Sequence, residues 1–191
     1  HPSLPIIQRN ILKIFKKVIE YLNSSENSMV FDEDFFTIIM NQIHRSTPFQ
    51  VAALKILNSF SHSKKLLIFD SLIQFLPHII DLMSTDIPFE VKYLCFQFLF
   101  SILEISDYPF ILNHLIVFDS IAPVLISLSF DEMISYVTLL EKLLKQFLNK
   151  FDDSLKKQLL SNGTYEILES FFENDGENDS IAKRVIDMLV L

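Results

Sequence analysis

Two stretches of nearly the same pattern, Pro48-Phe49-Gln50-Val51 and Pro88-Phe89-Glu90-Val91, decide the fold. Each begins an apolar run with helical spacing, and proline suits a first helical turn because its missing N–H would have no partner there. Pro5 begins a similar run, and Asp131 and Asn178 can cap two further helices. These five starts lie about 40–47 residues apart, which indicates a repeated helical unit.

A second series of apolar helices interleaves with the first. Its anchors are residues 34, 77, 123 and 166, so that this series has nearly the same period. Units of about 40–47 residues with two or three helices are typical of armadillo and HEAT repeats, in which each unit covers the apolar face of the next. The sequence therefore predicts an all-α fold, a right-handed armadillo/HEAT-type α-solenoid of about four repeats.

The expected domain is single and armadillo-like, and covers residues 1–191. Residues 5–23 are predicted to form the last helix of an incomplete unit. The four units that follow are expected at residues 26–62, 63–105, 107–149 and 151–191. Within each full unit, a short helix leads to a second helix, and a long helix follows.

Composition and charge restrict the class of partner. The 191 residues carry a net charge of −8, which disfavours nucleic acid and anionic membranes and permits basic peptides. Charged and polar residues interrupt every apolar stretch before the length of about 20 residues that a membrane span needs. Cys95, the one cysteine, lies in an apolar segment, and it excludes an intrachain disulfide. A reducing compartment, the cytoplasm or nucleus, is therefore expected.

The sequence contains no familiar catalytic motif. It has no Gly-x-Ser-x-Gly elbow, no Gly-rich phosphate loop and no His-Glu-x-x-His pair. No two of the five histidines lie three or four residues apart, which excludes a zinc face on one helix. The paired acids lie at predicted helix starts, where they interact with the helix dipole. We expect no enzymatic activity, no cofactor and no metal site.

Several segments resemble armadillo repeats. Pro77 to Met83 and Pro123 to Leu128 look like the second helix of such a repeat, and Ser161-Asn162-Gly163-Thr164 looks like its glycine turn. The segment from Gly163 to Leu191 is similar in layout to the last repeat of importin-α nuclear-import adaptors. Those adaptors bind basic peptides through Trp-Asn pairs, and this chain has no Trp. The resemblance thus implies either the peptide-free end of such an adaptor or a diverged armadillo protein with another partner.

A partner is expected on the concave wall, which the third helices line in armadillo proteins. The exposed stripes of these helices give the candidate binding residues Lys55, Asn58, His62, Tyr93, Gln97, Ser101, Glu104, Ser135, Thr138, Lys142 and Lys145. The predicted function is a protein or peptide scaffold, with a nuclear-transport adaptor as its sharpest form. Two alternatives remain: these are ordinary solvent-facing residues, or the chain is an assembly module that packs end-on with another copy or a larger complex. The oligomeric state is left open.

Overall fold

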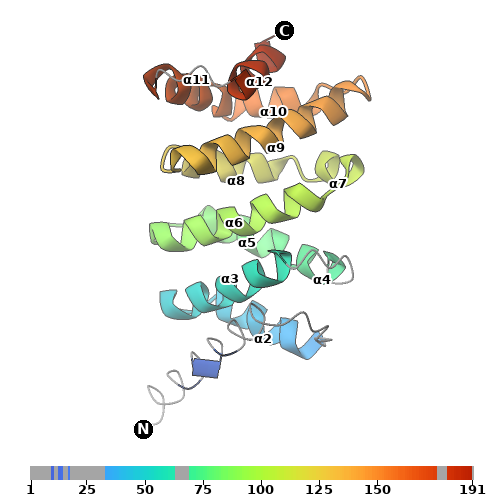
Figure 1. The fold of residues 1–191 in the computed structure, drawn as a ribbon. Coiled ribbons are helices and arrows are strands. Elements are labelled where there is room, and N and C mark those ends of the chain that lie inside the picture. The colour runs from blue at the N-terminus through green and yellow to red at the C-terminus, as the bar shows by residue number, and fades with distance from the viewer. Residues whose placement is uncertain are drawn as a thin grey trace. The chain divides into compact units, whose positions relative to one another are not determined.

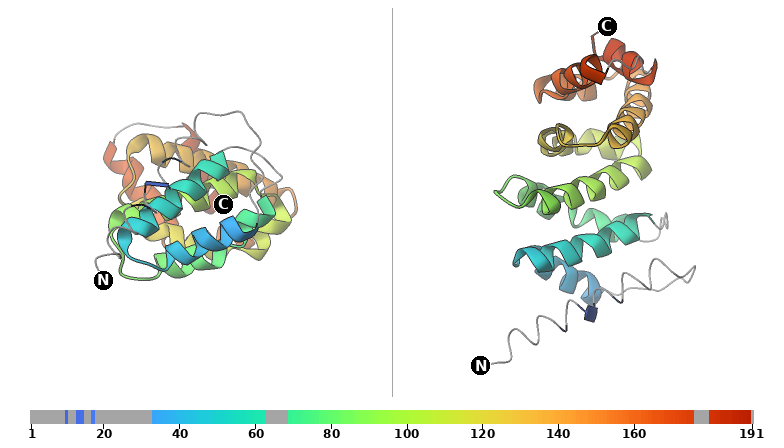
Figure 2. Two further views of the ribbon diagram at one scale, coloured as in Figure 1. Left: turned by 90° about the horizontal axis from the view of Figure 1, so that it is seen from below. Right: turned by 60° about the vertical axis from the view of Figure 1, so that its left-hand side comes forward.

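The computed structural model describes residues 33–62, 69–175 and 180–190, together with residues 10, 13, 14 and 17. The described part is all-α, as the sequence predicts, and it contains no strand. Each described element is a helix in every view (Figures 1 and 2). Most of the predicted helix 5–23, and the start of the unit at residue 26, fall outside the described residues.

The chain forms two compact units, residues 1–102 and 103–191. In the first unit the helices are α2 (Glu33–Ile43), α3 (Thr47–His62), α4 (Phe69–Ile73), α5 (Leu76–Met83) and α6 (Phe89–Ile105), whose last three residues belong to the second unit. The second unit continues with α7 (Tyr108–Asn113), α8 (Ile116–Leu125), α9 (Phe130–Leu148), α10 (Ser154–Ser161), α11 (Thr164–Asp175) and α12 (Ser180–Val190). The expectation of a single repeat domain stays a prediction.

The long helices begin close to the residues that the repeat pattern predicts. The expected starts at 48, 88, 131 and 178 correspond to helices that begin at residues 47, 89, 130 and 180. Local hydrogen bonds stabilise the first turns of α7 and α9. Asp107 Oδ1 accepts the Phe110 N–H at 3.0 Å and caps α7, and the Glu132 carboxylate accepts the Ser129 N–H at 2.8 Å at the start of α9.

Pro123 does not mark the start of its helix. The sequence pattern equates Pro77 with Pro123, but Pro77 lies in the first turn of α5 whereas Pro123 lies inside α8. The reason is that α8 begins seven residues earlier, at Ile116, with buried Val117 and Phe118 in its first turn. Pro123 is exposed and cannot donate to Asp119 O, four residues earlier, so this position costs the helix one internal hydrogen bond.

Aromatic side chains make up much of the core of the first unit. The Phe36 ring lies 5.9 Å from the Phe60 ring and 6.0 Å from the Phe75 ring, measured between centroids, so that α2, α3 and the start of α5 share one cluster. Edge-to-face and tilted pairs of this kind add about 0.5–1.5 kcal/mol each beyond the burial of their area. Cys95 of α6 lies in the same unit, is fully buried, and burial raises its pKa to about 12.

In the second unit, α9 packs against α12 and contacts α7 and α10. Tyr136 of α9 is fully buried; burial raises the pKa of its hydroxyl, and a hydrogen bond with the buried Thr164 at the start of α11 opposes this rise. These contacts hold one side of α9 in the protein. They leave the opposite side to solvent.

Two residues of the second unit have a left-handed backbone. Gly163 has a φ of +80° in the turn before α11, where the sequence predicts a glycine turn. Phe151 has a φ of +55° and ends α9 with a Schellman-type pair of bonds, from its own N–H to Leu148 O and from the Asp152 N–H to Phe147 O. Glycine usually occupies this position. Here it is held by Phe151, which is 99% exposed.

Within residues 33–62, 69–175 and 180–190, no helix combines the length and the apolar character needed to cross a membrane.

Candidate partner-binding surface

The candidate binding residues of α3 differ in their exposure to solvent. Lys55 is exposed, and its Nζ lies 3.6 Å from Glu90 Oε1 on α6. Asn58 is only 6% exposed, and its Nδ2 donates to Leu94 O on α6 at 3.1 Å. The prediction that Asn58 lies on an exposed stripe is therefore wrong, because α6 covers it and its amide bridges the two helices. His62 is the last residue of α3, and its side chain lies outside the described residues.

The candidate binding residues of α6 that belong to the first unit are half-buried or buried. Tyr93 and Gln97 are half-buried. Ser101 is 3% exposed, and within the described part of the chain its hydroxyl has no hydrogen-bond partner. Its expected exposure is wrong because α6 is apolar nearly all round and is covered on more than one side. Tyr93 stacks on Phe89 with ring centroids 6.1 Å apart, which fixes the ring along the helix.

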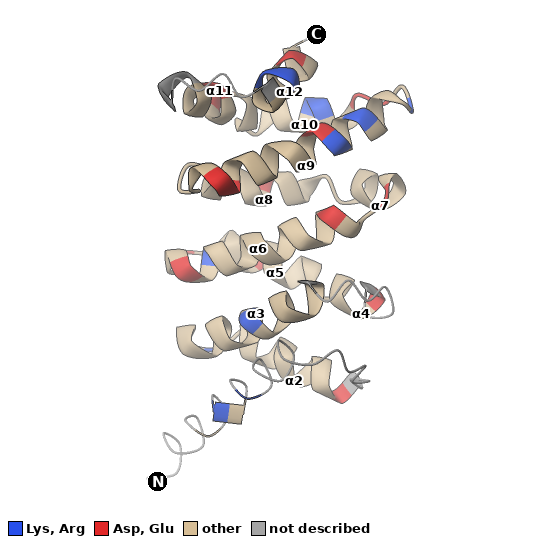
Figure 3. Ribbon diagram, viewed as in Figure 1, with Lys and Arg blue, Asp and Glu red and all other residues tan. Residues whose placement is uncertain are grey.

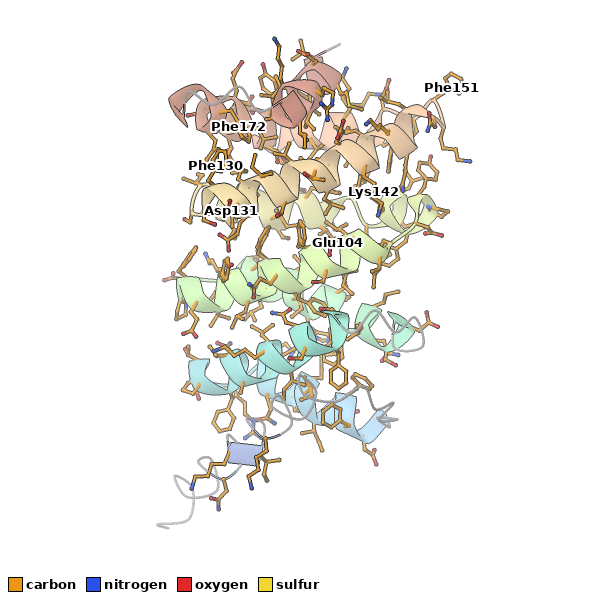
Figure 4. The ribbon with its side chains drawn as sticks, viewed as in Figure 1. Glu104, Phe130, Asp131, Lys142, Phe151 and Phe172 are labelled. Carbon is orange, nitrogen blue, oxygen red and sulfur yellow. The ribbon has the colours of Figure 1, made fainter. Side chains whose placement is uncertain are left out.

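In the second unit, all four α9 candidates are exposed. With Asp131, they form a row along one side of the helix at spacings of three and four residues, which we name the α9 face: Asp131, Ser135, Thr138, Lys142 and Lys145. Figure 4 shows its first residue near the start of α9 and Lys142 further along. Asp131 was expected at a helix start, as a cap and as a charge that interacts with the helix dipole, and not as part of this surface.

The two hydroxyls of the α9 face are oriented by their own helix. Ser135 Oγ donates to Asp131 O at 2.9 Å, and Thr138 Oγ1 donates to Ile134 O at 2.8 Å. Each proton is thus used within the helix, whereas the oxygen lone pairs remain on the exposed side. Both hydroxyls can accept hydrogen bonds from the N–H groups of a bound chain.

Lys142 and Glu104 are brought together by a bond to the backbone. Lys142 Nζ donates to the carbonyl oxygen of Glu104 at 2.8 Å (Figure 4). Glu104 lies in the last turn of α6, where carbonyls lack partners within the helix and a cation interacts favourably with the helix dipole. Because the acceptor is neutral, this bond leaves the charge of Lys142 available to an anionic group.

Lys145 belongs to an ionic network centred on Glu141. Lys145 Nζ lies 2.8 Å and Arg184 Nε 2.7 Å from Glu141 Oε1, and the Glu141 side chain is only 11% exposed. The hydrogen bond from Arg184, followed by that from Lys145, lowers the pKa of the Glu141 carboxyl to about 2, against the opposing effect of burial. The carboxylate is therefore charged at neutral pH, and it joins α9 to α12.

An aromatic cluster adjoins the acidic end of the α9 face. Phe130 stacks on Phe171 with centroids 6.2 Å apart and meets Phe172 edge-on at 6.4 Å, as Figure 4 shows for the second pair. All three rings are half-buried, so they present apolar surface to a partner. Along α9 the charge changes from acidic in the first turn to basic in the last turn (Figure 3). The sequence argument missed the cluster because its members come from two helices.

Among the described residues, no group of three or more His, Cys, Asp or Glu side chains is arranged to hold a metal ion. Histidine spacing along the sequence tests only for pairs on one helix. His44 and His78 nevertheless meet from two different helices, with His44 Nε2 3.1 Å from His78 Nδ1.

Comparison with known proteins gave no relative: the chain matches no protein-family model, no curated protein and no solved structure. The geometry described above is therefore the basis for a proposed function.

Proposed function

We propose that this chain is a non-enzymatic scaffold of armadillo type that binds a protein or peptide partner. The observation that carries the proposal is the α9 face, on which five consecutive positions of one helical row are polar and exposed. Apolar side chains hold the other side of α9 in the second unit, so this row is rigidly presented. A recurring order of two shorter helices and a longer third helix, in α4–α6 and α7–α9, supports the armadillo assignment.

The chemistry of the α9 face favours an extended segment as the partner. Its hydroxyl oxygens can accept main-chain N–H groups, Lys142 can pair with an acidic residue, and Asp131 with a basic residue. Exposed ion pairs contribute only about 0.2–1 kcal/mol each. Most of the affinity would therefore come from apolar contact with Phe130, Phe171 and Phe172 at the acidic end of the face.

The sharpest form of this proposal is a nuclear-transport adaptor of importin-α type in the cytoplasm or nucleus. It rests on the likeness of Gly163 to Leu191 to the last repeat of those adaptors, and on the left-handed φ of +80° at Gly163. The chain has no Trp, so a ladder of Trp-Asn pairs is not available to grip a lysine stem. Asn58, the nearest counterpart of the ladder asparagine, donates within the protein to Leu94 O. The partner we propose is thus held by other side chains.

A capture experiment tests the α9 face directly. The tagged chain would be compared with the double variant S135R/T138R in a native cell extract, because two arginines on this row would block an extended partner. Ser161 provides a matched control on α10, since it too is exposed and its hydroxyl donates within its own helix, to Gln158 O at 3.0 Å. We expect a partner that the parent chain and S161R retain and that S135R/T138R loses.

The result that would overturn the proposal is equal capture by all three proteins. Charge reversal of Lys142 together with Lys145 should also weaken a peptide partner. Those two changes would, however, break the bonds to Glu104 O and Glu141 as well, so their effect on stability must be measured in parallel. The hydroxyl variants avoid this because, among the described residues, Ser135 and Thr138 hydrogen-bond within α9.

A second candidate function is that of an assembly module which packs end-on with another copy or a larger complex. The observation that favours it is exposed apolar surface in the first unit, where Ile14 is 59% and Ile38 50% exposed. Light scattering on the purified chain separates the two functions. A monomer at high concentration would remove self-assembly, and I38D would dissolve a dimer that uses this surface.

A further inference from the structure

Two imidazole rings of the first unit face each other across helices far apart in sequence. His44 directly follows α2, and His78 lies in the first turn of α5. His44 Nε2 lies 3.1 Å from His78 Nδ1, with ring centroids 5.1 Å apart and planes inclined by 73°. From this geometry we infer that the two histidines form a binding site for a divalent transition-metal ion that prefers imidazole, such as Zn²⁺.

The packing of the first unit holds the two rings in place. Each histidine is next to a fully buried residue, Ile43 before His44 and Ile79 after His78. The Phe36–Phe75 ring contact joins the same two chain segments at 6.0 Å. The positions of both backbones are thus fixed by the core, and the side chains themselves remain accessible to an ion.

The distance between the nitrogens suits a shared metal ion. Zn–N bonds are about 2.0–2.1 Å long, so two imidazole nitrogens on one ion are about 2.9 Å apart at a right angle and about 3.4 Å apart in a tetrahedron. The observed 3.1 Å lies between these limits. In the metal-free protein one ring donates its N–H to the other. For both of these nitrogens to bind a metal ion, the donating ring must carry its proton on its other nitrogen instead, so that each ring is neutral and offers a lone pair.

A pocket of the first unit lies near the two histidines in sequence, although neither histidine lines it. The pocket has a volume of about 360 Å³ and is lined by residues of α2 and of the α4–α5 segment, among them the polar side chains of Thr37, Asn41, Ser71 and Gln74. Asn41 precedes His44 by three residues, and Gln74 precedes His78 by four. Water would complete the coordination of an ion bound by these two imidazoles.

Calorimetric titration of the full 191-residue chain with Zn²⁺ tests the site. We expect one ion per chain, and a dissociation constant that rises about tenfold or more in both H44Q and H78Q, because a single imidazole is left. H114Q is the matched control, since His114 lies in the second unit with Nδ1 2.8 Å from Phe110 O. It should bind Zn²⁺ as the parent chain does.

A second measurement keeps the result interpretable if a variant folds poorly. In NMR spectra of the parent chain, Zn²⁺ should shift the imidazole resonances of His44 and His78 together and leave those of His114 unchanged. Absence of Zn²⁺ binding by the parent chain would overturn the inference, and so would binding by H44Q and H78Q that is as tight as that of the parent chain. Shifts confined to other histidines would overturn it too. The outcome is independent of the α9 face, which lies in the other unit.

Discussion

Replacing Glu141 with Gln tests whether the ionic link between α9 and α12 stabilises the second unit. Glu141 accepts hydrogen bonds from Arg184 Nε at 2.7 Å and Lys145 Nζ at 2.8 Å. The Gln side chain keeps an acceptor of the same shape but removes the negative charge. Hydrogen bonds to charged groups contribute about 1.5–3 kcal/mol each, and solvent reduces this here because Arg184 and Lys145 are half exposed. We expect E141Q to lower the free energy of unfolding by about 1–2 kcal/mol at pH 7.

The contribution of Glu141 to stability should depend on pH. The pKa of the Glu141 carboxyl is lowered from its ordinary 4.5 to about 2 in the folded protein. A depressed pKa means that the unfolded chain takes up the proton first, so the contribution to stability is complete above pH 4.5 and is lost as the pH falls toward 2. The difference between the parent chain and E141Q should therefore shrink steadily below pH 4.5.

Urea unfolding followed by far-UV circular dichroism, at pH 7 and again near pH 3, measures both quantities. Glu166 of α11 provides the control, because it is exposed and E166Q should change stability by less than about 0.5 kcal/mol at neutral pH. Equal stability of E141Q and the parent chain at pH 7 would show that the network contributes nothing. A difference that persisted unchanged at pH 3 would refute the role of the charge.

Three further changes concern the ends of helices in the second unit, each measured by the same urea unfolding. F151G should raise stability by about 0.5–1 kcal/mol, because Phe151 has a φ of +55° and its ring is 99% exposed; a loss would mean that the ring packs in solution. G163A should cost about 1 kcal/mol through its φ of +80° alone, since an added Cβ would meet its nearest neighbour, Glu166 Oε2, at an ordinary 3.9 Å; an unchanged midpoint would contradict this. D107A should cost about 0.5–2 kcal/mol by removing the 3.0 Å bond to the Phe110 N–H, and D107N should restore most of it; equal loss in both would count against capping.

The helical character of the chain could be predicted from the sequence because the signals are local. Proline before an apolar run favours a first helical turn, and Pro48 and Pro88 lie within one residue of the starts of α3 and α6. Pro123 misled the same reasoning. An exposed proline can also lie inside a helix, as Pro123 does. A proline followed by apolar residues therefore does not show by itself whether it lies in the first turn or further along the helix.

The exposure of the candidate binding residues was only partly predictable. On α9 the polar and apolar sides are well separated, and Ser135, Thr138, Lys142 and Lys145 are exposed as expected. On α6 apolar residues surround almost the whole helix, so the position of Ser101 on the helix does not reveal that a neighbour covers it. Asn58 is buried for a similar reason, because α6 supplies the carbonyl that its amide needs.

Contacts between residues of different helices could not be predicted from the spacing of residues in the sequence. His44 and His78 are 34 residues apart, and the cluster of Phe130 with Phe171 and Phe172 joins α9 to α11. Such pairs depend on the angle and register with which helices pack, which no local pattern encodes. The proposed metal site and the apolar end of the α9 face both come from contacts of this kind.

The burial of Cys95 gives the protein an intrinsic reporter of its own opening. It is the chain's one thiol, it lies in the interior of the first unit on α6, and its pKa of about 12 keeps it protonated. A disulfide reagent can therefore react only in the moments when that part of the core is exposed to solvent, where the thiol regains ordinary acidity. The labelling rate would then report how often the first unit opens locally and exposes Cys95, without an engineered probe. A ligand that binds to the first unit would lower this rate.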